Sequence, residues 1–433
     1  MLIRWLWLNQ RLFNKTKRNM DDDRERVNEM RDLGRRLKLN INNRFMNTKS
    51  LKLPTVVQEH LVDYKMPINL NYMWNWGFIG GVCLMIQIVT GIFLVMHYVP
   101  DVNGAFDSVE HIMREVKMGW LIRYMHANGA SMFFIIIYIH MLRGIYYGSY
   151  YYPREGVWIT GVMIYALMMA TAFLGYTLVY GQMSLWGSTV ITNMITAIPK
   201  WGALMLKWII GGYTIGDATL KRFFSLHYLI PMIILGMVLI HLAILHIKGS
   251  NNPTGLSIVG DEWNKKEKTN FYPKYYIKDG LSLIIVLMLL IAIVSYRPNI
   301  LGHVDNYIKA DMMVTPEHIV PEWYFLPFYA ILRSIPSKIG GILGMIGAII
   351  LLMILPIMER YRIKRETIEN IRGPEWKMGY RIWFWIFVAC CLILGWVGGK
   401  PVEEPYVMVG RIMTIYYYIY MICLIIRFRW WKK

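Results

Sequence analysis

Four histidines occur as two pairs with the same spacing. His126 and His140 bracket the apolar stretch "HANGASMFFIIIYIH", and His227 and His241 bracket "HYLIPMIILGMVLIH". On a helix that turns about 100° per residue, residues 14 positions apart lie about 40° short of four full turns. The imidazoles of each pair therefore share nearly one helix face and lie about 21 Å apart along the axis. Two such helices would form two facing imidazole pairs, one at each of two depths.

Facing imidazoles without a nearby carboxylate or thiolate suit a metal that takes two axial nitrogen ligands. A haem held by two histidines has this ligand set. A zinc ion would need a third or fourth ligand, which the two segments do not offer. A single histidine in an apolar helix can simply hydrogen-bond a neighbouring helix. The repeated spacing favours metal ligation, because ionisable groups inside membranes usually mark function.

Two arginines flank the first histidine pair. Arg123 lies three residues before His126, and Arg143 lies three residues after His140. Each arginine is therefore on the face of its histidine, one turn nearer the end of the segment. A guanidinium group is suited to binding the carboxylate of a haem propionate. For Arg143, an interfacial side chain that reaches toward water is the alternative.

Four glycines repeat the same spacing. Gly77 and Gly91 lie 14 residues apart, as do Gly161 and Gly175. Glycine lets another group approach the backbone closely, which a flat macrocycle between helices requires. Small residues also serve ordinary packing between membrane helices. The match with the histidine spacing favours the haem interpretation.

The elements that carry these residues are expected to be membrane helices. The chain has 433 residues, of which 56% are hydrophobic and 17% are charged. Apolar runs of about 18 residues or more can cross a hydrocarbon core about 30 Å thick. Within lipid the backbone must satisfy its own hydrogen bonds, so such runs are helices. We expect an all-α membrane protein with eight transmembrane helices, including a four-helix bundle that holds two haems. The predicted segments are 75–98, 126–147, 157–179, 224–247, 280–296, 338–358, 379–397 and 406–427.

The predicted domain organisation has three parts. Residues 1–70 form a charged N-terminal extension, 71–250 a haem-binding four-helix region, and 251–433 a C-terminal four-helix region. The first 73 residues include 15 Lys and Arg and 8 Asp and Glu, so we expect no cleavable secretory signal. The four cysteines lie in apolar runs and form no C-x-x-C motif, which predicts packing roles.

Basic residues predict the orientation in the membrane. Eight crossings place both termini on one side, together with the loops near 148–156, 248–279 and 359–378. These parts hold most of the 47 Lys and Arg residues. The positive-inside rule then places the termini on the negative side of the membrane. The net charge of +19 is explained by this topology and by contact with anionic lipid, rather than by nucleic-acid binding.

Several motifs together resemble a known family. From Asn71 to the C-terminus the chain contains "RYMHANGASMFF", "GQMSLWGSTVITN", "GSNNPTG", "YIKD", "PEWYFLPFYAILRSIP" and "GKPVEEPY". In this order they resemble mitochondrial cytochrome b, the quinone-handling core of the ubiquinol–cytochrome c reductase complex. The resemblance implies a multi-pass protein of the mitochondrial inner membrane with two non-covalent haem b groups and ubiquinone or ubiquinol. Implied partners are the Rieske iron–sulfur protein, cytochrome c1, other complex subunits and lipid, in a dimeric complex.

The resemblance also implies an electron path between two haems. His126 and His227 would hold the low-potential haem near the positive side, and His140 and His241 the high-potential haem near the negative side. Quinol oxidised on the positive side would give one electron to the iron–sulfur protein. The other electron would cross through both haems and reduce quinone on the negative side, coupled to proton translocation. The resemblance thus implies an enzyme subunit of a proton-translocating quinol–cytochrome c oxidoreductase.

The resemblance assigns residues to both quinone sites. The oxidation pocket would lie between the end of the third segment, the amphipathic linker around 182–215, and the "PEWY" loop. Glu322 would take a quinol proton, and Tyr324 and Tyr329 would line this pocket. The residues of the second site would be His246, Ser250, Lys278 and Asp279.

The chemistry of three of these residues can be argued from the sequence itself. Glu322 lies beside Pro321, Trp323 and Phe325, and an apolar setting would raise its pKa toward a value useful for proton transfer. A polar residue of an interfacial loop is the alternative. His246 follows His241 at the emerging helix end and can exchange protons with water near pH 7. Asp279 opens the fifth segment, where helix capping is an equally good explanation.

The chain departs from the family pattern in three places. Val179 and Tyr180 stand where Pro-Trp is common, at the rim of the expected oxidation pocket. The N-terminal arm is longer than usual, and the 248–279 loop carries a lysine-rich insert. We expect these two additions to bind partner subunits.

Three other classes of protein remain as alternatives. A secondary transporter could use buried histidines as proton relays, but we find no inverted repeat or paired broken helices. A transmembrane ferric reductase would normally bring a flavin- and nucleotide-binding domain. A purely structural membrane subunit would not require four spaced histidines.

Overall fold

The computed structural model describes residue 55 and residues 58–254, 268–363 and 378–426. Contacts divide the chain into a larger unit, Met66–Lys268 with Lys278–Lys433, and a smaller one that includes residues 58–65 and Thr269–Ile277. Each unit is described by itself. Most of the N-terminal extension and most of the lysine-rich insert lie outside the described residues, and their expected role in partner binding remains a prediction.

Eight helices of the described chain are long and apolar enough to cross a membrane, which confirms the predicted all-α membrane architecture. They are α3 (Trp76–Val95), α5 (Gly119–Tyr146), α6 (Glu155–Leu178), α9 (Asp217–Lys248), α10 (Lys274–Tyr296), α12 (Lys338–Ile363), α13 (Met378–Gly398) and α14 (Tyr406–Ile426). The shorter helices are α4 (Ala105–Arg114), α7 (Gln182–Asn193), α8 (Gly202–Ile210) and α11 (Leu326–Ser334). Two three-residue strands, β1 (Lys65–Pro67) and β2 (Lys268–Asn270), pair with one another.

Three of the helices begin earlier than the hydropathy pattern predicts. α5 begins at Gly119 rather than 126, α9 at Asp217 rather than 224, and α10 at Lys274 rather than 280. Each added turn contains charged side chains, among them Arg123. The apolar sequence pattern ends at the edge of the lipid, but a helix continues as long as its backbone hydrogen bonds and its packing persist.

The smaller unit contains a single turn of π-helix, Gln58–Val62. The Phe271 amide donates to the Tyr64 carbonyl at 2.9 Å, and Lys65 Nζ donates to Asn270 Oδ1 at 2.5 Å. Asn270 also donates to Asp63 at 3.2 Å. These bonds join the chain before the first membrane helix to the chain before the fifth.

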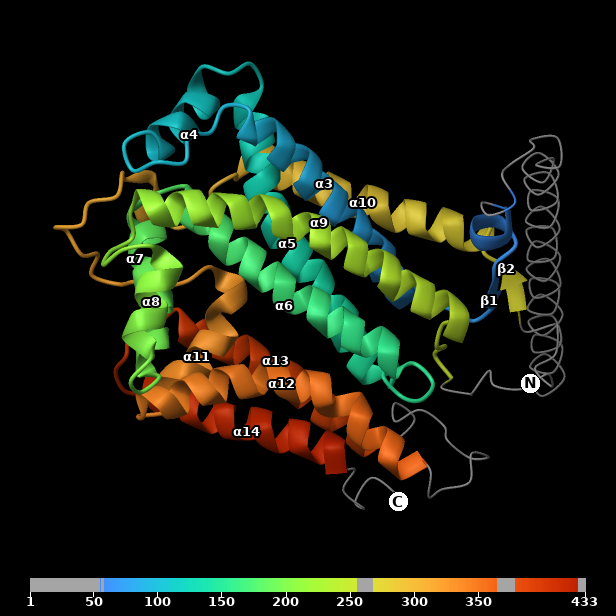
Figure 1. Ribbon diagram of the computed structural model, residues 1–433. Coiled ribbons are helices and arrows are strands. Elements are labelled where there is room, and N and C mark those ends of the chain that lie inside the picture. The colour runs from blue at the N-terminus through green and yellow to red at the C-terminus, as the bar shows by residue number, and fades with distance from the viewer. Residues whose placement is uncertain (1–54, 56–57, 255–267, 364–377, 427–433) are drawn as a thin grey trace, which may run out of the picture. The chain divides into compact units, whose positions relative to one another are not determined.

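In the larger unit, the four histidine- and glycine-bearing helices pack in pairs. α3 lies along α5 and α6 lies along α9, with further contact between α3 and α9 (Figure 1). Helices α11, α12, α13 and α14 pack against one another as a second group. Trp158 Nε1 joins the two groups by donating to the Leu352 carbonyl at 2.6 Å. Both groups contribute to one continuous cluster of buried apolar side chains.

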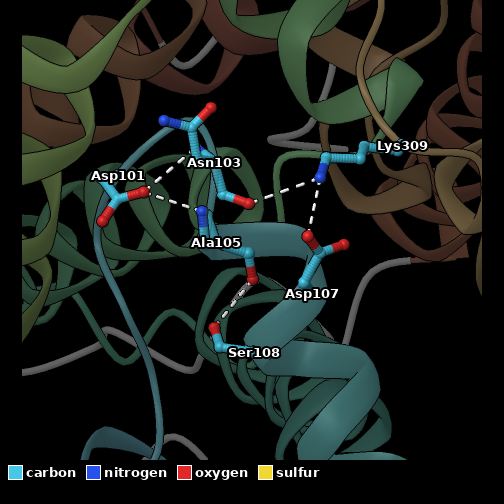
Figure 2. A network of polar contacts seen from close by, with 7 residues as sticks. Asp101, Asn103, Ala105, Asp107, Ser108 and Lys309 are labelled. Atoms are coloured by element: carbon cyan, nitrogen blue, oxygen red, sulfur yellow. Dashed lines mark hydrogen bonds and ion pairs between the residues drawn. The ribbon is translucent and has the colours of Figure 1, made fainter.

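A clamp of polar contacts holds α4 at one end of this unit. Lys309, from the loop after α10, donates to the Asp107 carboxylate at 2.7 Å and to the Asn103 carbonyl at 3.3 Å (Figure 2). Asp101 accepts from the backbone amides of Asn103 and Gly104 at 3.0 and 2.7 Å. Lys309 also forms an antiparallel β-bridge with Gly181, the residue just before α7. Three loops distant in sequence are thereby joined.

Candidate functional site

His126 of α5 and His227 of α9 face each other across the bundle. Their ring centroids are 6.3 Å apart, and the ring planes are inclined by 82°. With a metal–nitrogen bond of about 2.0 Å and about 1.1 Å from a ring nitrogen to its centroid, two imidazoles on opposite sides of one ion have centroids about 6.2 Å apart. Among the described residues, no three His, Cys, Asp or Glu side chains gather in a group that could hold a metal. The pair therefore fits axial ligation.

The hydrogen bonds of these two rings leave their second nitrogens available. Nδ1 of His227 donates to the Thr171 carbonyl at 2.8 Å. Nδ1 of His126 lies 2.9 Å from Thr90 Oγ1, whose own proton goes to the Ile86 carbonyl at 2.6 Å. The threonine oxygen must then accept the imidazole proton. Both Nε2 atoms are consequently unprotonated acceptors, the form that binds a metal.

The second pair repeats part of this arrangement. Nδ1 of His241 lies 2.9 Å from Thr160 Oγ1, which donates to the Gly156 carbonyl at 2.8 Å. His140 instead has Arg143 Nη2 at 3.3 Å from its Nδ1. Neither threonine was among the predicted site residues. Their signal was the position directly before a predicted glycine, since Thr90 precedes Gly91 and Thr160 precedes Gly161.

Each of the four predicted glycines lies against one histidine ring. A Cβ on Gly77 would be 3.1 Å from His140 Cε1, and one on Gly91 would be 3.3 Å from His126 Cε1. A Cβ on Gly161 would be 3.3 Å from His241 Cε1, and one on Gly175 only 2.9 Å from His227 Nδ1. The glycines of α3 and α6 thus provide the space in which imidazoles of α5 and α9 approach the neighbouring backbone.

Arg143 is placed to meet an anionic group. Arg143 Nη1 donates to Ser149 Oγ at 3.3 Å, and its guanidinium lies 5.2 Å from the centre of the Trp74 ring. Its Nε is buried and has no hydrogen-bond partner among the described residues. A buried donor of this kind calls for an acceptor, and a carboxylate is the strongest one. Together with the imidazoles and glycines, Arg143 fits a haem with its propionates.

A cavity of about 340 Å³ surrounds the first imidazole pair. Residues from five helices and the loop after α10 line it, including Gly91, Arg123, His126, Gly175, His227, Glu322 and Tyr324. Helix α4 contributes Phe106 and Val109, so the clamp on Asp107 in Figure 2 fixes one wall. The loop that carries Glu322 and the imidazole pair therefore open into the same space.

Glu322 is half-buried in this wall. Burial raises the pKa of its carboxyl to about 7, against the opposing effects of a hydrogen bond from the Tyr176 hydroxyl and the positive charge of Arg123. The predicted rise is confirmed, and its main cause is the expected desolvation. The Glu322 backbone is extended, with φ −55° and ψ 147°, and its side chain does not cap the following turn. The carboxyl is thus available for proton exchange.

A second cavity of about 190 Å³ lies on the other side of the same loop. Its lining is almost entirely apolar and includes Gly187, Pro321, Phe325, Phe328 and Tyr329. Tyr329 therefore lines this cavity, whereas Tyr324 lines the first one. The short 3₁₀ turn Trp323–Phe325 separates the two spaces. Both tyrosines were predicted to line one pocket, but they line different cavities.

Tyr324 is held rigidly where it stands. Its ring stacks on Phe134 of α5, with centroids 4.1 Å apart and planes inclined by 3°. Burial, and secondarily the charge of Glu322, raise the pKa of Tyr324 well above its ordinary value. The phenol is therefore neutral at physiological pH.

The four residues of the second predicted quinone site come from the ends of α9 and α10. His246 Nδ1 bonds the Leu242 carbonyl at 2.9 Å, and the buried Ser250 offers its carbonyl to Arg154 at 3.4 Å. Lys278 Nζ donates to the Leu70 carbonyl at 2.8 Å. Asp279 is buried within α10, five residues after its start at Lys274, so the capping explanation is wrong. The role of these four residues remains a prediction.

Val179 and Tyr180, which stand where the family commonly has Pro-Trp, also have defined positions. Val179 lines the first cavity, and Tyr180 is buried in the apolar cluster beneath α8 with φ +53°. The Tyr180 carbonyl accepts from the Ala310 amide at 3.1 Å. Tyr180 thus joins the α6–α7 corner to the loop after α10.

Comparison with known families gives two matches in succession. The family described as cytochrome b/b6/petB matches residues 61–249, and the family described as cytochrome b(C-terminal)/b6/petD matches residues 309–418. The two matches together cover both helix groups.

Individual proteins are similar over most of their length. Cytochrome b of Chondrus crispus is 53% identical over 86% of this chain and 94% of its own. Cytochrome b of Arabidopsis thaliana is 50% identical over 88% and 93%, and that of Rhodospirillum rubrum 49% identical over 89% and 94%. A solved chain described as hyperthermophilic respiratory complex III superposes with a TM-score of 0.79 at 32% identity, covering 89% of this chain and 97% of the other.

Proposed function

The chain belongs to the cytochrome b family and is a subunit of a respiratory complex III, in which we propose that it binds haem and quinone and oxidises quinol on the positive side of the membrane. Quinone is reduced on the negative side, and the two reactions together move protons across the membrane. The observation that carries this proposal is the shared cavity of the first imidazole pair and Glu322.

Two haem b groups, when bound, supply one-electron carriers at two depths of the membrane. His126 and His227 would hold the group of lower potential, and His140 and His241 the group of higher potential. The Nδ1 bonds to Thr90, Thr160 and the Thr171 carbonyl orient the rings and increase the basicity of the ligating nitrogens. Arg143 would bind a propionate of the second group.

Glu322 is the proposed proton acceptor for quinol. Oxidation of a quinol to a quinone releases two electrons and two protons, so a base must stand near the reacting hydroxyl. A carboxyl with a pKa of about 7 is half deprotonated at physiological pH, which is the best compromise between available base and proton affinity. The Tyr176 hydroxyl orients the carboxylate by hydrogen bonding.

The apolar cavity that contains Tyr329 is the proposed place of the quinol ring. Its small, nearly apolar lining excludes water around the reacting ring. Glu322, which lines the first cavity, directly follows Pro321 of that lining. The second quinone would bind at the ends of α9 and α10 among His246, Ser250, Lys278 and Asp279.

The reaction requires partners. One electron of each quinol must leave for an external carrier, and the proposed carrier is the Rieske iron–sulfur protein, which passes it to cytochrome c1. Cys83 and Cys390 are buried in membrane helices, consistent with packing roles. The proposed location is the mitochondrial inner membrane, and the proposed assembly is a dimer of the complex.

A redox titration of the optical spectrum of the purified complex tests the proposal. We expect two b-type components with distinct midpoints. Replacing His227 by Ala should remove only the component of lower potential, and replacing His241 by Ala only the other. A single component, or loss of both with either replacement, would contradict the assignment of the two pairs.

A further inference from the structure

The turn that contains Glu322 is held by its backbone rather than by its carboxylate. The Phe325 amide donates to the Glu322 carbonyl at 2.9 Å and closes the 3₁₀ turn Trp323–Phe325. The Glu322 side chain makes no capping bond. A turn of three residues has little stability of its own. Its position in the wall must come from contacts with a larger element.

One face of α5 supplies these contacts. Trp323 Nε1 donates to Ser131 Oγ at 3.0 Å, and Tyr138 Oη donates to the Tyr324 carbonyl at 2.5 Å. Between them, the Phe134 ring stacks on Tyr324. Positions 131, 134 and 138 are three and four residues apart and therefore form one stripe of the helix. The two residues after Glu322 are thus both hydrogen-bonded to α5, Trp323 as a donor and Tyr324 as an acceptor.

The Tyr138 bond belongs to a short chain of hydroxyls. Tyr138 Oη lies 3.1 Å from Tyr165 Oη. Because the single Tyr138 proton goes to the Tyr324 carbonyl, Tyr165 must donate to Tyr138. Tyr165 has no exposed surface, and Ser131 is 4% exposed. A buried carbonyl left without its donor loses free energy that water cannot restore, so the bond strongly favours one position of the turn.

The same helix carries other parts of the site. His126 and Arg123 lie on α5, and the charge of Arg123 acts on the Glu322 carboxyl. We propose that Ser131 and Tyr138 are positioning residues that hold the Glu322 turn at a fixed distance from the imidazole pair. This inference rests on the proposed role of Glu322 as proton acceptor.

A matched control exists at the other end of α5. The buried hydroxyl of Tyr380 donates to the Ile145 carbonyl at 2.6 Å, just as the Tyr138 hydroxyl donates to the Tyr324 carbonyl. Tyr380→Phe therefore removes the same chemical bond to the same helix without touching the Glu322 turn. A merely structural role of Tyr138 would make the two Phe variants equivalent.

The test compares Tyr138→Phe with Tyr380→Phe in the purified complex. Tyr138→Phe should lower kcat for quinol oxidation about fivefold, the effect of one lost hydrogen bond. It should also move the midpoint of the acid limb of the pH profile down by about half a unit, because a looser turn admits water to the carboxyl. Both haem midpoints should stay unchanged, and Tyr380→Phe should leave the pH profile unmoved. Equal pH profiles for the two variants would overturn the proposal.

A second pair of variants and a second measurement separate this inference from the proposed function. Ser131→Ala and Trp323→Phe should each loosen the turn, and their combination should add little, because they remove the same bond. Hydrogen exchange of the 319–329 backbone should increase in Tyr138→Phe and Ser131→Ala but not in Tyr380→Phe. Unchanged exchange there overturns the positioning role. If Glu322→Gln retains the acid limb, the proton-acceptor function fails, and hydrogen exchange still decides the positioning role.

Discussion

The two helix groups use glycine in different ways. In the group of α3, α5, α6 and α9, the glycines at 77, 91, 161 and 175 each lie against an imidazole of the neighbouring helix. In the group of α11 to α14, Gly398 lies against the Leu326 backbone and Gly347 against the Tyr418 ring. The first set provides space for ligands, and the second lets helices pack closely. The same residue type therefore serves a site in one group and the fold in the other.

The surroundings of buried polar groups differ in the same way. In the first group the Nδ1 atoms of three histidines are bonded, which leaves each Nε2 directed to other partners. In the second group, buried Tyr417 donates to the Ala348 carbonyl at 3.1 Å and so completes a helix contact. The polar groups of a site keep part of their hydrogen-bonding capacity unused within the protein, whereas the polar groups of a packed core use theirs in contacts within the protein.

The largest expected effect comes from adding a methyl group at Gly175. The new Cβ would lie 2.9 Å from His227 Nδ1, and this ring is enclosed between helices. Gly175→Ala should displace the imidazole and abolish the haem component of lower potential while retaining the other. Gly398→Ala places a Cβ 2.8 Å from the Leu326 carbonyl carbon and should instead lower the thermal stability of the whole protein. Absorbance spectra and melting curves of both variants measure the difference, and identical outcomes would break the comparison.

The next effect concerns Glu322, in the loop between the two groups. Its pKa of about 7 means that the carboxyl becomes a proton acceptor as the pH rises through neutrality. Quinol oxidation should therefore accelerate between about pH 6 and pH 8, and Glu322→Gln should lose this limb and about 10²-fold in rate. The raised pKa also makes the folded state less stable as the pH rises, because the folded chain holds this proton more tightly than the unfolded chain. A Gln variant with the original limb would exclude Glu322 as the acceptor.

The smallest effect is expected at Gly187. This glycine lines the apolar cavity, and a Cβ there would meet nothing within 4 Å. Gly187→Ala should fold normally and keep both haem midpoints, while the reduced space raises the KM for quinol about threefold, within the range for one added methyl group in an apolar pocket. A loss of stability comparable to that of Gly398→Ala would show that this glycine packs the fold rather than lining a site.

Much of the architecture could be predicted from local pattern. The thickness of a bilayer and the 3.6-residue helix repeat are fixed, so eight apolar runs predicted eight helices, and the histidine spacing predicted which helix faces carry the imidazoles. The raised pKa of Glu322 followed from its apolar neighbours. Helix starts were less accurate, as at α5, because charged residues such as Arg123 remain helical where the apolar pattern ends.

The sequence by itself determined the helices and the helix face that each histidine pair shares, because these depend on neighbours within a few turns. The facing of His126 and His227 was predicted, but only the tertiary structure decided that Thr90 orients the His126 ring. It also decided that Tyr324 and Tyr329 line different cavities, and that α5 holds the Glu322 turn. These contacts join residues far apart in the chain, and their geometry depends on how whole helices pack, which no local pattern specifies.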